Sequence, residues 1–174
     1  MARMLKIALA SVALTAFGLS ATTGWAQVPT APITAASTTT VPAYFTATPS
    51  LKMTRTADGV LVVEFNTRGG PIQFSAADHE AFVDAFYAIG RDRANKVVIL
   101  TGAGGEWMSG IDFASFGDVS DPDRWAKVHD EGTQVLENLL NIRVPVICAV
   151  EGKAWVHSEY CLTANVIIAG QGAT

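Results

Sequence analysis

The stretch VVILTGAGGEWMSGIDF, residues 97–113, determines the fold class that we expect for the chain. Residues 97–101 form a short apolar run rich in β-branched side chains, which is typical of a strand buried on both faces of a sheet. Gly102, Gly104 and Gly105 then allow a sharp backbone turn. A strand followed by a glycine loop and a short polar turn, here residues 109–112, can direct backbone N–H groups at an oxygen atom that gains negative charge.

This strand, glycine loop and Ser-Gly-Ile-Asp turn resemble the signature of the crotonase (enoyl-CoA hydratase/isomerase) superfamily. A second stretch, IRVPVICAVEGKA at residues 142–154, resembles the same family. The resemblance implies an α/β fold, the crotonase-like ββα spiral, over residues 51–174. It also implies that the N–H of Ile111 is an oxyanion-hole donor and that Met108 and Gly110 lie beside the substrate. The alternative is an ordinary α/β domain with a glycine-rich strand end.

The first 50 residues are expected to lie outside this domain. Arg3 and Lys6 precede an apolar run at residues 7–21, and small residues follow at 24–26. This pattern predicts a signal peptide at residues 1–26 and therefore an exported, periplasmic or secreted protein, with an uncleaved membrane anchor as the alternative. Residues 27–50 are rich in Thr, Ala and Pro and carry no charge, which predicts an extended linker whose Tyr44 and Phe45 pack against the domain.

The composition excludes some classes of function. A net charge of −4 and a pI near 5.3 leave no basic stripe for nucleic acid. No Cys/His spacing indicates a metal site. Cys148 and Cys161 are the only cysteines, and we expect two buried free thiols, although an oxidising compartment would permit a disulfide.

The pattern of the domain predicts parallel strands joined by right-handed crossovers. Asp58-Gly59 indicates a hairpin, and Ser75 with Asp78 indicates a capping box. The elements expected in order are strands at 52–56 and 60–66, a helix at 75–91, a strand at 97–101, a helix starting at Asp121-Pro122, and buried strands at 144–150 and 166–169. The second helix should bury one stripe of side chains, namely Trp125, Val128, Gly132, Val135, Leu136 and Leu139. His79 is expected at the surface or partly packed, and His129 and Glu131 are expected as solvated helix residues.

The loop after residue 152 departs from the common family pattern. Bulky residues and a histidine, GKAWVHSE at residues 152–159, replace a run of glycines that would approach a thioester carbonyl. This departure resembles the β-diketone hydrolase branch, which includes 6-oxocamphor hydrolase and cleaves a carbon–carbon bond without CoA. The stretches shared with that branch are DRxNKVVILTG at 92–102, IDFxSF at 111–116, LLxIxVPVI at 139–147 and HxE at 157–159.

The resemblance to this branch implies roles for individual residues. His157 would hydrogen-bond a substrate carbonyl, with Phe74 and Trp155 in the substrate pocket; the alternative for His157 is a ring that satisfies a loop carbonyl. Glu159 would handle a catalytic water, or it is simply an acidic residue at a helix N-terminus. The water-activating histidine of the branch and its aspartate partner would lie downstream of Thr174, so we expect a C-terminally incomplete domain or a degenerate protein.

Three functions follow from these expectations. The first is hydrolytic C–C cleavage of a β-diketone-like carbonyl substrate, with no cofactor. The second is enoyl-CoA hydration or isomerisation, with a CoA thioester as the substrate, and the third is an inactive crotonase-like scaffold. The resemblance further implies a homotrimer or hexamer for the full-length protein, and we expect poor solubility for the 174-residue chain by itself because strand edges would be exposed.

Overall fold

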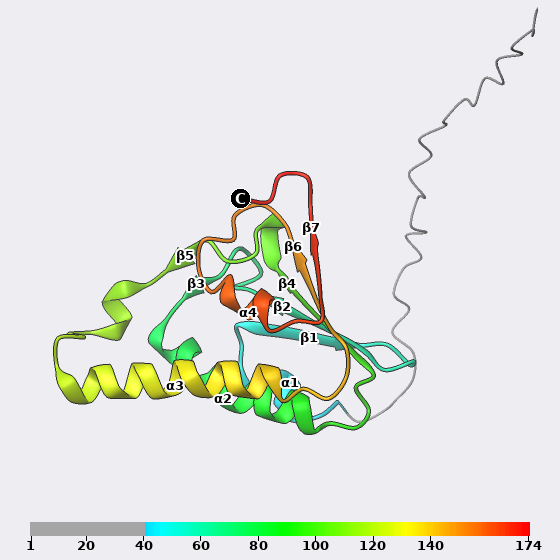
Figure 1. Ribbon diagram of the computed structural model, residues 1–174, viewed down its shortest axis with the longest axis horizontal. Coiled ribbons are helices and arrows are strands. Elements are labelled where there is room, and N and C mark those ends of the chain that lie inside the picture. The colour runs from blue at the N-terminus through cyan, green and yellow to red at the C-terminus, as the bar shows by residue number, and fades with distance from the viewer. Residues whose placement is uncertain (1–40) are drawn as a thin grey trace, which may run out of the picture. The chain divides into compact units, whose positions relative to one another are not determined.

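The computed structural model describes residues 41–174 (Figure 1). The expected signal peptide and most of the expected linker lie outside the described residues. Within residues 41–174, no helix is both long enough and apolar enough to cross a lipid bilayer.

A five-stranded sheet forms the centre of the domain. Its strands lie in the spatial order β1-β2-β4-β6-β7, with β1 antiparallel to β2 and all other neighbours parallel. The bounds are β1 Leu51–Arg55, β2 Val60–Phe65, β4 Val97–Gly102, β6 Val146–Val150 and β7 Val166–Ala169. Gly59 turns the β1–β2 hairpin with a φ of 87°, as the Asp-Gly pair predicted. The α/β class and the order of the elements are therefore confirmed.

Two long helices, α2 (Ala76–Arg91) and α3 (Pro122–Leu140), run side by side along one face of this sheet (Figure 1). Burial alternates along the strands, so that Leu61, Val98 and Val146 form one buried row across β2, β4 and β6. Along each of these strands, the residues that alternate with the buried ones are only half-buried. The expectation that residues 97–101 are buried on both faces is therefore wrong, because the helices cover one face only.

A second, two-stranded sheet lies beside the ends of the central strands. It consists of β3 (Gln73–Phe74) and β5 (Gly110–Ile111), which pair in parallel (Figure 1). Two 3-10 helices, Ala103–Gly105 and Phe113–Phe116, flank β5, and the short helix α4 (Glu159–Leu162) precedes β7. The chain between β4 and α3 lies against the loop that follows β6, because Met108 forms a β-bridge with Ala154 of that loop.

The caps confirm the predicted helix starts, but two expectations about burial are wrong. Ser75 and Asp121 cap α2 and α3 with their side chains. Trp125, expected in the core, is 56% exposed because the first turns of α3 extend beyond the sheet (Figure 1). The strand β7 is exposed at every residue, since no described element covers its outer edge or its faces.

The segment just before β1 is packed against the domain. Helix α1 (Tyr44–Ala47) places the Tyr44 hydroxyl 2.9 Å from Asp92 Oδ2, and Asn95 Nδ2 donates to that hydroxyl at 3.2 Å. Burial raises the pKa of Tyr44 to about 12. The expected packing of Tyr44 is confirmed, and ordered contacts begin before Leu51. Cys148 and Cys161 are both buried free thiols, as expected.

The capping box of α2 gives a stability prediction. Ser75 Oγ accepts from the Asp78 N–H at 3.3 Å, and the Ser75 N–H donates to Asp78 Oδ2 at 2.9 Å. Ser75→Ala should lower the free energy of unfolding by about 1 kcal/mol, measured by urea denaturation. Ser120→Ala, in an exposed turn, is the control and should change it by less than about 0.5 kcal/mol. Equal effects of the two substitutions would contradict the assignment.

Candidate active site

Trp107 joins the ends of the two central strands. Its backbone N–H donates to the Glu151 carbonyl at 2.8 Å, so the loop after β4 is attached to the loop after β6. The indole is fully buried, with its ring centroid 5.2 Å from that of Phe65. Its Nε1–H donates to the backbone carbonyl of His157 at 3.3 Å. This side chain therefore fixes the position of the loop that carries the candidate histidine.

Ile111 lies in β5, opposite Phe74 of β3. The N–H of Asp112 donates to the Phe74 carbonyl at 2.8 Å. Because successive strand residues direct their N–H groups to opposite edges, the Ile111 N–H points away from β3. The Gln73 side chain packs directly over Gly110, where a Cβ would displace the end of that glutamine. The predicted donor is thus held in a defined direction by β3.

Met108 connects β5 to the loop after β6. The Met108 side chain is fully buried, and its carbonyl accepts from the N–H groups of Trp155 at 3.0 Å and Val156 at 3.1 Å. Those two N–H groups are therefore occupied, whereas the N–H of His157 makes no hydrogen bond to any of residues 41–174. The Trp155 ring is 65% exposed and lies beside Lys153 Nζ, at 5.1 Å, so it is not brought to His157.

His157 has an unusual backbone conformation. Its φ of 48° lies in the left-handed region, which favours glycine. Within residues 41–174 only Arg68 is another non-glycine residue with positive φ. A histidine in this conformation carries a backbone cost that the Trp107 hydrogen bond and the packing of its ring must offset. The structure thus retains the turn that a glycine would make while adding an imidazole.

The imidazole of His157 is enclosed by aromatic rings. It stacks on Tyr160 with centroids 4.8 Å apart, and it meets the edge of Phe74 at 4.2 Å. Nδ1 lies 2.7 Å from Glu159 Oε1. Nε2 is buried and has no hydrogen-bond partner in the structure. A buried polar atom without a partner is costly, which makes this nitrogen the clearest candidate for contact with a ligand.

The charge of Glu159 determines which hydrogen bonds Nε2 of His157 can form. The hydrogen bond with His157 lowers the pKa of Glu159, although partial burial opposes the shift. Glu159 is therefore a carboxylate that can only accept, and Nδ1 carries the hydrogen. Nε2 then has a free lone pair in the neutral imidazole and an N–H in the imidazolium. The same nitrogen can take a proton from water or donate a hydrogen bond to a carbonyl oxygen.

Phe74 is fully buried and links three parts of the site. It is the partner of Ile111 in the β3–β5 pair, it contacts the His157 ring, and its ring centroid lies 5.9 Å from that of His79. Glu159 occupies the first turn of α4, as one of the two expectations had it, and it also bonds His157; its handling of a catalytic water stays a prediction. The structure thus brings Ile111, Phe74, His157 and Glu159 together, with Met108 and Gly110 as supports.

A second histidine was missed by the sequence analysis. His79, expected at the surface or partly packed, is only 5% exposed and is thus packed more completely than expected; its Nδ1 lies 3.0 Å from Glu131 Oε2. Lys127 Nζ contacts the other oxygen of Glu131 at 3.1 Å. The rings of His79 and His157 are 6.3 Å apart. Helical spacing places His79 on the apolar stripe of α2, but spacing cannot show that Glu131 of α3 faces it.

No group of three or more His, Cys, Asp or Glu side chains in the described part of the chain is arranged to hold a metal ion.

The Glu159–His157 bond predicts a pH effect with a defined sign. Because the pKa of Glu159 is lowered in the folded protein, the pair stabilises folding above the ordinary carboxyl pKa. That contribution is lost as the pH falls through the folded value. In a ¹³C NMR titration of the side-chain carboxyl, His157→Ala should raise the midpoint of Glu159, whereas His129→Ala should leave it unchanged. The same midpoint in all three proteins would rule out the interaction.

Comparisons with known proteins identify relatives of this chain. The curated "Probable enoyl-CoA hydratase 1, peroxisomal" of Arabidopsis thaliana is 26% identical over 132 residues, which are 71% of this chain and 45% of that protein. A solved β-diketone hydrolase from the cyanobacterium Anabaena, bound to (S)-3-oxocyclohexyl acetic acid, is 49% identical. It matches with a TM-score of 0.76 over 78% of this chain and 54% of its own.

More distant structures share the fold alone. An enoyl-CoA hydratase from Mycobacterium smegmatis, 22% identical, matches with a TM-score of 0.63 over 72% of this chain and 49% of its own. The chain therefore spans about half the length of the relatives it matches. The model of the enoyl-CoA hydratase/isomerase family matches residues 55–174, the domain that carries the site. The chain belongs to the enoyl-CoA hydratase/isomerase family, the crotonase superfamily.

Proposed function

We propose that this crotonase-family protein is a hydrolase that cleaves a carbon–carbon bond in a β-diketone-like substrate. The observation that carries the proposal is the buried, unpartnered Nε2 of His157, whose Nδ1 is held by Glu159. The likeness to the Anabaena β-diketone hydrolase, at 49% identity, supports the same class of substrate. The proposal requires no cofactor.

In the proposed reaction, the His157 imidazolium donates a hydrogen bond from Nε2 to one carbonyl oxygen of the substrate. The N–H of Ile111 is proposed as a backbone donor to the same site. Water adds its oxygen to the other carbonyl carbon, and the bond from that carbon to the carbon between the two carbonyls breaks. The electron pair passes into an enolate whose oxygen is the one that His157 stabilises. Protonation of the enolate carbon gives a ketone and a carboxylic acid.

The surroundings of His157 favour a hydrocarbon skeleton on the substrate. Tyr160 and Phe74 cover the ring on two sides, and both are buried. Their low polarity strengthens the interaction between Nε2 and a developing enolate oxygen. Proton removal from the attacking water is left to another group of the full-length protein.

We extend the proposal to an exported protein that assembles as a trimer or hexamer. The exposed apolar side chains of β7 are a surface that such an assembly could cover.

The direct test uses the full-length protein and a panel of cyclic 1,3-diketones. Turnover is followed by loss of the diketone ultraviolet absorbance and by mass spectrometry of the keto acid. His157→Ala should lower kcat by about 10²- to 10⁴-fold, because a positioned donor to the reacting oxygen is removed. His129→Ala is the matched control, since the His129 side chain is 63% exposed and its ring nitrogen pairs with Asp130, its neighbour in the chain. Unchanged turnover in His157→Ala would contradict the role of His157.

The second candidate is an enoyl-CoA hydratase or isomerase acting on an acyl-CoA thioester. The family match and the Arabidopsis relative favour it. The loop 152–159 weighs against it, because its side chains occupy space where family glycines would approach a thioester. Calorimetric titration of the full-length protein with a non-hydrolysable acyl-CoA analogue should give no heat of binding under our proposal. Saturable binding together with hydratase turnover would favour the alternative, and ligand binding without any turnover would favour an inactive scaffold.

A further inference from the structure

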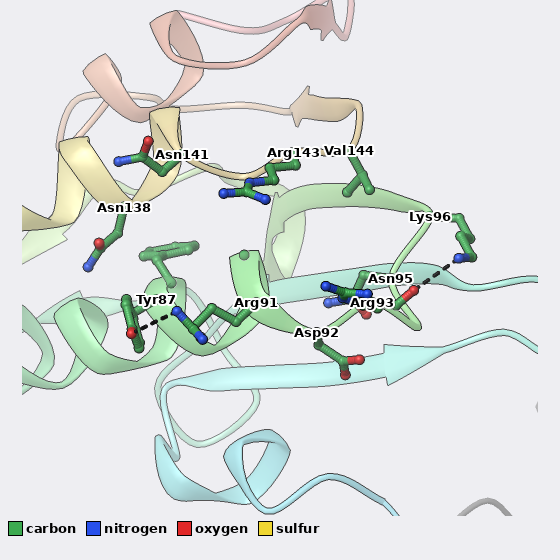
Figure 2. A pocket seen from close by; sticks show the side chains of 12 residues that line it. Tyr87, Arg91, Asp92, Arg93, Asn95, Lys96, Asn138, Asn141, Arg143 and Val144 are labelled. Carbon is green, nitrogen blue, oxygen red and sulfur yellow. Dashed lines mark hydrogen bonds between the residues drawn. The ribbon is translucent and has the colours of Figure 1, made fainter.

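A basic groove lies between the C-terminal ends of α2 and α3 and includes the turn that leads into β4 (Figure 2). Its volume is about 660 Å³, within the range of small-molecule sites. Its polar lining includes the cations Arg91, Arg93, Lys96 and Arg143 and the amides Asn138 and Asn141. Figure 2 shows Asn138, Asn141 and Arg143 on one side of the groove and Arg91 and Arg93 on the other.

The concentration of positive charge here is unusual for an acidic chain. The sequence has twelve Lys and Arg residues against sixteen Asp and Glu, and two of the twelve, Arg3 and Lys6, precede residue 41. Four of the ten in the described part line this one groove. All four side chains are exposed, and none forms an ion pair with any of residues 41–174.

The single carboxylate in the lining is already neutralised. Asp92 Oδ2 accepts from Arg55 Nη1 at 2.5 Å and from the Tyr44 hydroxyl at 2.9 Å. Burial opposes ionisation, but the hydrogen bonds from the Ala94 N–H, Arg55 and Tyr44 lower the pKa of Asp92. Asp92 therefore stabilises the contact between α1, β1 and this turn, and it does not neutralise the positive charge of the groove.

Structural roles account for only part of the charge. Arg91 lies in the last turn of α2, where a cation offsets the helix dipole, and its Nη1 donates to the Tyr87 hydroxyl at 3.2 Å. Lys96 Nζ donates to the Arg93 carbonyl at 2.9 Å. Neither the Arg93 guanidinium nor that of Arg143 makes a hydrogen bond to any described residue. Two free guanidinium groups thus face one groove, and each can bind an oxyanion through two parallel hydrogen bonds.

We propose that this groove binds a small multivalent oxyanion, a molecule with clustered phosphate or carboxylate groups. Arg93 and Arg143 would clamp the anion from the two sides, and Arg91 and Lys96 would add charge. The site is separate from the candidate active site: the groove adjoins the start of β4, whereas His157 follows the end of the parallel strand β6. The proposal therefore stands independently of the diketone chemistry.

The test is calorimetric titration of the full-length protein with inorganic pyrophosphate and, separately, with citrate at constant ionic strength. Arg93→Gln/Arg143→Gln should weaken binding at least about tenfold, since two charged contacts are removed. The control is Arg68→Gln, which removes one exposed cation after β2, away from the groove, and should leave the affinity unchanged. Tighter binding of pyrophosphate would identify a phosphorylated ligand, and tighter binding of citrate a polycarboxylate.

The proposal is overturned if neither probe binds at concentrations up to about 1 mM. It is also overturned if the double variant binds as tightly as the parent, or if Arg68→Gln weakens binding as much as the double variant does. The substituted side chains are exposed, so thermal melting should show all proteins folded. If the double variant melts early, Arg143→Gln alone provides the comparison, with a smaller but measurable loss of affinity.

Discussion

The buried side chain of Trp107 is the constraint on which the candidate site depends. The backbone N–H of Trp107 bonds the loop after β4 to the loop after β6. The indole N–H donates a hydrogen bond to the carbonyl of His157. Gly102 makes this possible, because a Cβ there would collide with the backbone carbonyls of Glu106 and Trp107. The strand end, the glycine loop and the histidine loop therefore form one connected unit. The left-handed backbone of His157 is tolerated within that unit because its neighbours over-determine it.

The chemical meaning of the site lies in the two nitrogens of one imidazole. The Glu159 carboxylate accepts the hydrogen of Nδ1. Nε2 is therefore an acceptor in the neutral imidazole and a donor in the imidazolium. Burial between Tyr160 and Phe74 removes competing water from the ring. The neighbouring His79–Glu131 pair repeats the same arrangement from the two long helices, with its Glu131 also held by Lys127. The fold thus places two carboxylate-bound histidines against one aromatic residue, Phe74.

Much of the fold followed from local sequence signals, and the site followed only in part. The Asp58-Gly59 turn, the Ser75 cap and the Asp121-Pro122 start are short-range effects, and the structure confirmed each of them. Ile111 and His157 were found because a family resemblance connected distant segments. The pairing of His79 with Glu131, the exposure of Trp125 and the exposure of β7 could not be predicted, because they depend on which faces meet in three dimensions. Composition also concealed the basic groove, since a net charge of −4 does not show where cations gather.

A crystal structure of the full-length protein with a bound keto acid product would show whether Nε2 of His157 binds the reacting carbonyl. We expect a ketone oxygen within about 2.6–3.2 Å of Nε2, with Nδ1 still hydrogen-bonded to Glu159. A product bound elsewhere, with Nε2 contacting only water or protein, would contradict it.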